Sequence, residues 1–515
     1  MNILSWITFF PILGILGIQF IPKENEKMIK WVSAAVTFVP FVLSLYMLSL
    51  FNLNDPDFQL VERFMWISGI NVHYHMGVDG ISILMVLLGA MLSFLCIFAS
   101  WNVKKMVKGY FSMFLLLHVG MLGVFCALDF FLFFVFWEVM LLPMYFLVGI
   151  WGGERKEYAA IKFFLYTMFG SVLMLVGMLA IYFFSKGPNG GIGTFNFIQL
   201  ATQDWTQFSV VLFGWELPFD ATVWWLLFVG FAVKVPVFPF HTWLPWAHVQ
   251  APTAVSVILA GVLLKMGTYG FLRVNYALFP EATLSFSGIL FYLGIINVIY
   301  GAFCAMAQKD LKKLVAYSSV SHMGYVLMGM SVFNPEGIQG AVLQMFNHGL
   351  SSAMMFMLVG ILYDRLHHRY IETPDGKLGF GGIAQKAPRL TAVWTLAVFS
   401  SLGLPLLNGF VSEAFVFLGS FKVYPTETIV ASLGIVLTAA YLLWMVQRVF
   451  LGPWTTQMKN DQGVLVPAGE IAAMKANEWV VLIPLGILCV WVGVYPQPFL
   501  NFIMGTLNVL IEGIR

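Results

Sequence analysis

Long apolar stretches separated by short polar loops follow one another along almost the whole chain. About twenty apolar residues are enough for a helix to cross a bilayer. The pattern therefore predicts 14 membrane-spanning helices. We expect them near residues 3–21, 29–50, 80–100, 109–127, 129–150, 160–185, 222–240, 253–275, 286–306, 313–333, 338–364, 389–420, 427–450 and 477–495. A last apolar piece, 499–514, is too short to span and is expected at the interface or against a neighbouring helix.

Composition supports a membrane protein. Of the 515 residues, 60% are hydrophobic and only 10% are charged, whereas about 25% of residues are charged in soluble domains. We therefore predict an all-α polytopic membrane protein whose residues 1–515 form one membrane domain. The loops leave no room for a large soluble domain, so surface chemistry has to come from other chains.

Loop charges predict the orientation of the chain. With 14 helices, 20 of the 27 lysines and arginines fall in the loops of one side and 5 in those of the other. Basic loops stay on the cytoplasmic side of a membrane. This asymmetry predicts that both termini lie on the outer side.

Several kinds of site are excluded by the motifs that the sequence lacks. The four cysteines lie singly in apolar segments, and there is no CxxC motif or Cys/His cluster, so zinc and iron–sulfur sites are not expected. There is no glycine-rich phosphate loop or dinucleotide fingerprint. NADH, ATP and nucleic acid are therefore not expected ligands of this chain.

Two lysines lie in the middle of predicted helices. Lys234 is in 222–240 and Lys265 is in 253–275. A charge at that depth costs roughly 3 to more than 10 kcal/mol, so it needs a partner, a water-filled cavity or the neutral state. Pro236 and Pro239 follow Lys234 and predict a broken helix there. Broken helices at mid-membrane expose backbone polar groups to ions in transporters.

Four more ionisable residues lie inside predicted helices. Glycine and proline near Glu413 predict another broken helix. Gln344, His348, Ser351 and Ser352 follow i, i+4, i+7 and i+8 spacing and therefore share one helix face. Such a face suits a chain of water molecules. The four residues are Glu138, His322, His348 and Glu413.

Each of these six residues also has a purely structural interpretation. A single buried histidine is usually a hydrogen-bonded packing residue, which is the role we expect for His118. A lone acid or lysine can be half of a structural ion pair. Two acids, two lysines and two histidines on six helices are more than a scaffold needs, so we favour ion conduction.

The order of these residues indicates two repeats. Glu138 and Lys234 lie on the fifth and seventh helices, and His322 and Glu413 lie on the tenth and twelfth. The offset is five helices in both pairs, which predicts five-helix repeats over 109–275 and 286–450. An odd offset inverts the second repeat in the membrane, as in ion-translocating folds.

Three runs of sequence resemble a known family, the antiporter-like proton-translocating subunits of respiratory complex I (NADH:quinone oxidoreductase). The runs are LLHVGMLGVFCALDFFLFFVFWEVMLLPMYFLVGIWGG, FAVKVPVFPFHTWLPWAHVQAPTAVSVILAGVLLKMGTYGFLR and DLKKLVAYSSVSHMGYVL. The resemblance implies that Glu138 pairs with Lys234, that Lys265 leads onward, and that Glu413 ends a proton pathway. It also places His322 and His348 between Lys265 and Glu413.

The resemblance has further implications. Most of the family has lysine where this chain has Glu413, which sets it apart from subunits L and N of the same complex. Subunits L and N are the neighbours implied on either side, in a bacterial cytoplasmic membrane, with FMN, iron–sulfur clusters and quinone in partner subunits. The alternatives are a subunit of a multi-subunit Na+/H+ antiporter or membrane-bound hydrogenase, and a non-conducting scaffold of the membrane arm.

Overall fold

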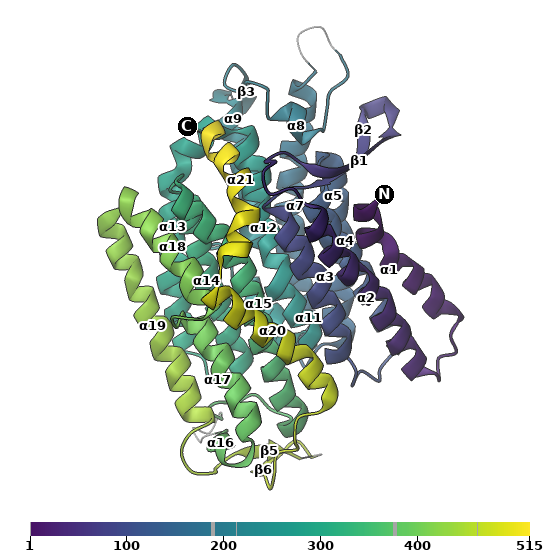
Figure 1. The fold of residues 1–515 in the computed structure, drawn as a ribbon, viewed down its shortest axis with the longest axis vertical. Helices are drawn as coiled ribbons and strands as arrows, with labels where there is room; N and C mark the ends of the chain where they lie inside the picture. The colour runs from purple at the N-terminus through teal and green to yellow at the C-terminus, as the bar shows by residue number, and fades with distance from the viewer. Residues whose placement is uncertain (1, 187–190, 213, 374–378, 461, 515) are drawn as a thin grey trace.

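The computed structural model describes residues 2–186, 191–212, 214–373, 379–460 and 462–514. Most helices run side by side along the long axis of the molecule, and the two chain ends lie toward the same end of the bundle (Figure 1). The expected all-α membrane fold is confirmed. Lys377 and Arg515, which the loop charges include, lie outside the described residues.

The 14 expected crossings are present within the described residues, some of them in two pieces. Their bounds differ from the predicted ones by a few residues. In chain order they are α1 (Ile3–Phe20), α2 (Glu26–Leu50), α3 (Ser82–Ala99), α4 (Val107–Cys126), α5 and α6 (Phe130–Val139, Leu141–Trp151), α7 (Lys156–Phe184), α9 and α10 (Phe219–Lys234, Trp243–Gln250), the span Thr253–Tyr276, α13 (Pro280–Met306), α14 (Leu311–Met330), α15 (Pro335–Leu366), α17 and α18 (Pro388–Leu402, Asn408–Val423), α19 (Pro425–Val449) and α20 (Ala476–Val494).

Eleven crossings in the described part of the chain are individually long and apolar enough to span a membrane. The other three are α9, α14 and the α17–α18 pair. α9 and the α17–α18 pair are shortened by breaks, and α14 carries serines and a histidine. These three crossings also carry Lys234, His322 and Glu413.

Small hairpins and short helices lie at both ends of the bundle. At the end where both termini lie, here called the hairpin side, β1 (Gln59–Ile67) pairs with β2 (Val72–Val78) through the turn Ser68–Ile70. β3 (Ser209–Leu212), β4 (Trp215–Pro218) and α8 (Phe197–Leu200) lie there too. The opposite side carries β5 (Gln457–Lys459), β6 (Leu465–Pro467) and α16 (Ile383–Lys386). The sequence pattern did not predict the β1–β2 hairpin.

Prolines account for two of the breaks. Pro143 cannot donate to the carbonyl of Val139, and α5 ends at Val139. α9 ends at Lys234, two residues before Pro236. The freed backbone groups of this second break are satisfied by side chains, because Trp243 Nε1 donates to Val233 O at 2.8 Å and Asn297 Nδ2 donates to Pro236 O at 3.2 Å. A break in α9 was expected, whereas the one between α5 and α6 was not.

Between α17 and α18 the break is made by glycine and proline. Gly403 has a φ of +77°, a left-handed conformation that favours glycine, and Pro405 follows. A Cβ at this position would also lie 2.8 Å from Glu413 Oε2. The absence of a side chain at Gly403 therefore both turns the chain and leaves room for the carboxylate.

The two crossings at the centre of the bundle are Thr253–Tyr276 and α15, whose most apolar windows are completely buried. The first consists of α11 (Thr253–Ile258), a π-helical segment Leu259–Leu263, α12 (Leu264–Gly270) and a second π-helical segment Phe271–Tyr276. Lys265 therefore lies between two π-helical segments. Such segments are rare and occur often at functional sites.

The last apolar piece forms a helix, α21 (Gln497–Ile514), which packs on its own chain. Phe499, Ile503 and Leu507 recur on one face, and that face contacts α15, α13 and α3. Thr506 Oγ1 also accepts a hydrogen bond from Gly80 N at 2.9 Å. The expected packing against a neighbouring helix is confirmed. At about 1.5 Å per residue its 18 residues extend about 27 Å, so it is longer than the pattern indicated.

Candidate functional site

Lys234 is the last residue of α9 and is buried in an aromatic environment. Its exposed fraction is 1%. The ammonium nitrogen lies 5.0 Å from the centroid of the Trp137 ring and 5.9 Å from that of Phe163. It has no hydrogen-bond partner within the described residues. The aromatic faces and a distant carboxylate are therefore what stabilises a charge here.

That carboxylate is Glu138, one residue before the end of α5. It acts electrostatically on Lys234, but the two do not form an ion pair in the described structure, and Glu138 Oε1 has no hydrogen-bond partner. The side chain of Trp137, held by a 3.2 Å hydrogen bond from Nε1 to Ser171 Oγ, lies against Lys234 instead. The direct pairing that the resemblance implied is absent from this structure.

Lys265 lies in direct contact with His348. Lys265 Nζ is 2.7 Å from His348 Nδ1 and also donates to the carbonyl of Ala260, which lies in the first π-helical segment. Ammonium donates and neutral imidazole nitrogen accepts, or the reverse if lysine is neutral and histidine is protonated. The contact therefore joins two bases that compete for one proton in an environment where Lys265 is completely buried.

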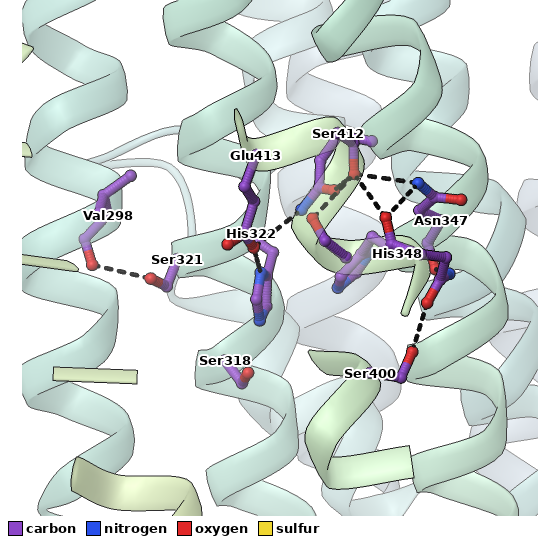
Figure 2. Close-up of polar contacts among 12 residues, drawn as sticks. Val298, Ser318, Ser321, His322, Asn347, His348, Ser400, Ser412 and Glu413 are labelled. Carbon is purple, nitrogen blue, oxygen red and sulfur yellow. Dashed lines mark hydrogen bonds and ion pairs between the residues drawn. The ribbon is translucent and has the colours of Figure 1, made fainter. Parts of the chain in front are cut away.

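His322, on α14, and Glu413, on α18, form the next contact. His322 Nδ1 lies 3.2 Å from Glu413 Oε1, and both side chains are buried (Figure 2). The rings of His322 and His348 have centroids 5.5 Å apart. A single water molecule can bridge polar groups across such a gap. The two histidines, from two other helices, thus lie in sequence between Lys265 and Glu413.

Amides and hydroxyls surround Glu413 on its other side. Gln344 Nε2 donates to Glu413 Oε1 at 3.5 Å, and Ser412 Oγ donates to Gln344 Oε1 at 2.5 Å. Asn347 Nδ2 donates to Ser412 Oγ at 3.0 Å and to Asn408 O at 2.8 Å. These side chains connect α15 with the first turns of α18 (Figure 2). We call Gln344, Asn347, Asn408, Ser412 and Glu413 the α15–α18 network.

The structure therefore divides the six predicted residues. It brings four of them, Lys265, His348, His322 and Glu413, into one buried row that crosses α12, α15, α14 and α18. Glu138 and Lys234 form no hydrogen bond or ion pair with that row or with each other in the described structure, and both Glu138 Oε1 and Lys234 Nζ lack a hydrogen-bond partner. The hydrogen bond from His118 to Ile7 O, at 3.2 Å, agrees with its expected packing role.

Other polar residues of the site were missed by the sequence interpretation. Asn347 and Ser412 are sequence neighbours of His348 and Glu413, and this adjacency was the available signal. Arg273 was counted among the five basic residues of the outer side, at the end of the predicted helix 253–275, but it is buried in the second π-helical segment, against Asp79. Its position eight residues after Lys265 was the signal for a shared helix face.

The donor set of the site does not resemble a metal centre. No group of three or more His, Cys, Asp or Glu side chains that could hold a metal is found among the described residues. The row consists of one amine, two imidazoles and one carboxylate, each of which can bind and release a proton. Amines, imidazoles and carboxylates are the side chains that take part in proton transfer in proteins.

The comparisons with known proteins agree with this chemistry. The sequence model of the family described as NADH:quinone oxidoreductase/Mrp antiporter, TM matches residues 127–438. NADH-quinone oxidoreductase subunit M of Rickettsia prowazekii (strain Madrid E) is 40% identical over 99% of both chains. The chain belongs to the NADH:quinone oxidoreductase/Mrp antiporter membrane-subunit family.

Other members of this membrane-subunit family are similar along their whole length. Subunit M of Rhodobacter capsulatus is 39% identical over 99% of this chain and 96% of its own. A chain in the structure of respiratory complex I from Thermus thermophilus with bound NADH matches with a TM-score of 0.85 and 27% identity over all of both chains. A chain of the Mrp complex from Dietzia sp. DQ12-45-1b, at 21% identity and a TM-score of 0.82, shares the fold.

Proposed function

We propose that the chain is the proton-translocating membrane-arm subunit of an NADH:quinone oxidoreductase, equivalent to subunit M of its relatives. The observation that carries the proposal is the buried row from Lys265 through His348 and His322 to Glu413. Proton-binding groups inside a membrane are costly and mark ion pathways. The similarity to subunit M chains over their full length supplies the complex in which the pathway works.

The proposed cycle is electrostatic. In this cycle, an ionised Glu138 attracts the positive charge of Lys234. When quinone chemistry in the partner subunits rearranges the membrane arm, this attraction weakens and burial drives the proton off Lys234. The proton passes to the Lys265–His348 pair, then through His322 to Glu413.

The setting of the subunit follows from the same proposal. FMN, the iron–sulfur clusters and quinone are bound by partner subunits, and subunits L and N flank this chain in the bacterial cytoplasmic membrane. The hairpin side faces outward, in line with the few basic residues in its loops. Protons enter from the opposite side and leave on the hairpin side.

The two halves of the pathway correspond to two inverted repeats, over residues 109–275 and 286–450. Each repeat contributes a broken crossing, α9–α10 in the first and α17–α18 in the second. Lys234 lies at the first break, and Glu413 lies one helical turn beyond the start of α18.

A Na+/H+ antiporter subunit is the second candidate, because the Mrp chain shares the fold. Glu413 argues against it, since most of the family has lysine at that position. Transport tells the two apart: an antiporter subunit moves Na+ against protons without NADH, whereas the proposed subunit moves protons only during NADH oxidation.

The experiment is NADH-driven proton pumping in membrane vesicles that carry Lys265→Met. Methionine keeps the length and apolar packing of the side chain but cannot carry a proton. The matched control is Lys309→Met, which changes a lysine whose side chain is 63% exposed. We expect the assembled Lys265 variant to lose pumping and the control to keep it. Normal pumping by an assembled Lys265→Met complex, checked on a native gel, would establish the scaffold alternative.

A further inference from the structure

A second buried cation lies on the same crossing as Lys265. Arg273 is 8% exposed, and its Nη2 donates to Asp79 Oδ2 at 2.5 Å. Asp79, just before α3, is 1% exposed. Tyr269 lies between Lys265 and Arg273 in the sequence, so the three follow i, i+4, i+8 spacing, which places residues on one helix face. Eight residues correspond to about 12 Å along a helix, toward the hairpin side.

The polar groups of this stripe are occupied by one another. Tyr269 OH donates to Phe125 O at 3.1 Å and accepts from Arg273 Nε at 3.1 Å. The other carboxylate oxygen, Asp79 Oδ1, accepts from Ser82 N at 2.9 Å and from Ile81 N at 3.1 Å, which fixes it to the start of α3. In the described structure, the hydroxyl of Tyr269 and both carboxylate oxygens of Asp79 are therefore engaged by hydrogen bonds.

The outer end of the stripe is also covered. The ring centroid of Phe58, from the segment before β1, lies 4.6 Å from the Arg273 guanidinium carbon. A guanidinium does not lose its proton in proteins, so it cannot relay one. A fixed arginine in a narrow pore repels protons and other cations, as in water-selective channels. Arg273 therefore combines an aromatic cover, two hydrogen bonds to buried partners and a fixed positive charge.

We propose that Arg273, Tyr269 and Asp79 form a proton seal between Lys265 and the hairpin side of the membrane. The seal blocks the short direct exit from Lys265 and leaves the sideways route through His348, His322 and Glu413. The inference rests on the proposed function, because a seal is needed only if Lys265 carries a translocated proton. Without the seal, a proton on Lys265 would leak directly to the hairpin side of the membrane.

The competing explanation is that Arg273 and Asp79 only join α3 to the crossing that carries Lys265. Buried ion pairs often contribute little to stability, and apolar replacements can stabilise a protein more. If the Arg273–Asp79 pair is only structural, removing it should change the assembly or the melting temperature of the complex. Only a seal predicts a proton leak in a complex that is assembled and at rest.

The experiment measures the passive proton permeability of proteoliposomes that contain the purified complex, with a pH dye inside and no NADH. The variant is Arg273→Gln, and Arg273→Lys keeps the positive charge. The control is Lys422→Gln, which removes a surface ion pair of 2.6 Å with Glu336. We expect Arg273→Gln to raise the resting proton flux several-fold, at least about fivefold. The Lys422→Gln complex should stay near the wild-type flux, and Arg273→Lys, which keeps a charge that can be released, should leak less than Arg273→Gln.

Two further variants keep the test decisive. If Arg273→Gln does not assemble, Tyr269→Phe removes only the hydroxyl that ties Arg273 to Phe125 O, and we expect about a twofold leak from it. The double variant Lys265→Met/Arg273→Gln should return to the wild-type flux, because the leak passes through Lys265. Wild-type flux in the assembled Arg273→Gln complex, or in Tyr269→Phe where that variant replaces it, would overturn the seal.

The same set of variants separates the seal from the proposed function. If the Lys265→Met complex pumps normally, the proposed function fails, whatever resting proton flux the Arg273→Gln complex shows. If Lys265→Met abolishes pumping but Arg273→Gln does not leak, only the seal fails. A leak that persists in the double variant would show that water enters by another path and would also overturn the seal.

Discussion

The two halves of the site hold their charges in different ways. Around Lys234, the near neighbours are aromatic rings, and neither its ammonium nitrogen nor Oε1 of Glu138 has a hydrogen-bond partner in the described structure. Around Glu413, an imidazole, two amides and a hydroxyl form a connected set of contacts. One half acts through an electric field and the other through direct contacts.

This difference suits the two halves to different tasks: the Lys234 half to a change of charge interaction, and the Glu413 half to proton passage. At an effective dielectric constant near 20, two unit charges about 6 Å apart interact by about 3 kcal/mol, and a small displacement changes that energy without breaking any bond. The α15–α18 network instead has several hydrogen bonds of about 1 kcal/mol each, which hold Glu413 in one position. The first half is therefore suited to respond to a rearrangement, and the second to pass a proton along a fixed row.

The largest expected effect is at Lys234. Lys234→Met removes the proton, and Lys234→Arg keeps a positive charge that cannot be released. If Lys234 has to release its proton, both variants should lower NADH-driven pumping at least about tenfold, which corresponds to about 1.4 kcal/mol in a barrier. The measurement is the initial rate of acidification in vesicles, normalised to assembled complex. If Lys234→Arg pumps normally, Lys234 contributes a fixed charge only and the task assigned to the Lys234 half is wrong.

The next effect is at Glu413, where a conservative variant tests the fixed geometry. Glu413→Gln keeps the size and removes the charge, so we expect close to tenfold slower pumping, since a lost charged partner costs about 1.4 kcal/mol or more. Glu413→Asp keeps the charge but withdraws the carboxylate from His322 and Gln344 by one methylene. We expect it to slow pumping several-fold. Equal rates for Glu413→Asp and wild type would show that the second half does not depend on direct contacts.

The sequence predicted the crossings and their ionisable residues well, because apolar length and isolated charges are local signals. Lys234, Lys265, Glu138 and Glu413 stand out as isolated ionisable residues within predominantly apolar stretches, whatever the tertiary structure. Proline and glycine likewise indicate breaks locally, and the breaks after Lys234 and near Gly403 were found in this way.

The contacts between helices could not be predicted, because they depend on how distant segments pack. Nothing in the sequence states that His348 contacts Lys265 or that Trp137 lies against Lys234. Asn347 and Ser412 have no local signal beyond their position, since a buried amide or hydroxyl is common in helices. Arg273 was misplaced for a related reason: a basic residue near the end of an apolar stretch is usually in a loop, and its buried partner is 194 residues away in the chain.

A smaller effect is expected at Trp137, the aromatic neighbour of Lys234. A buried cation–π contact contributes about 0.5–2 kcal/mol, so Trp137→Leu should slow pumping about two- to fivefold. Ser171→Ala is the matched control, because it removes the 3.2 Å hydrogen bond from Trp137 Nε1 and keeps the ring. Pumping rates of the two variants, measured with equal amounts of assembled complex, decide the point. A larger loss in Ser171→Ala than in Trp137→Leu would mean that the indole orientation, and not its contact with the charge, matters.

The smallest effect is expected within the α15–α18 network. Ser412→Ala removes the donor to Gln344 and the acceptor for Asn347, at a net cost of about 1 kcal/mol for each hydrogen bond lost. Because Gln344 and His322 still contact Glu413, pumping should fall by about twofold or less, while the melting temperature falls measurably. Ser321→Ala is the control, since Ser321 donates to Val298 O at 2.8 Å, away from the network (Figure 2). If both variants lose the same stability but only Ser412→Ala pumps more slowly, the α15–α18 network contributes to conduction. If both variants pump more slowly, the network contributes only to packing.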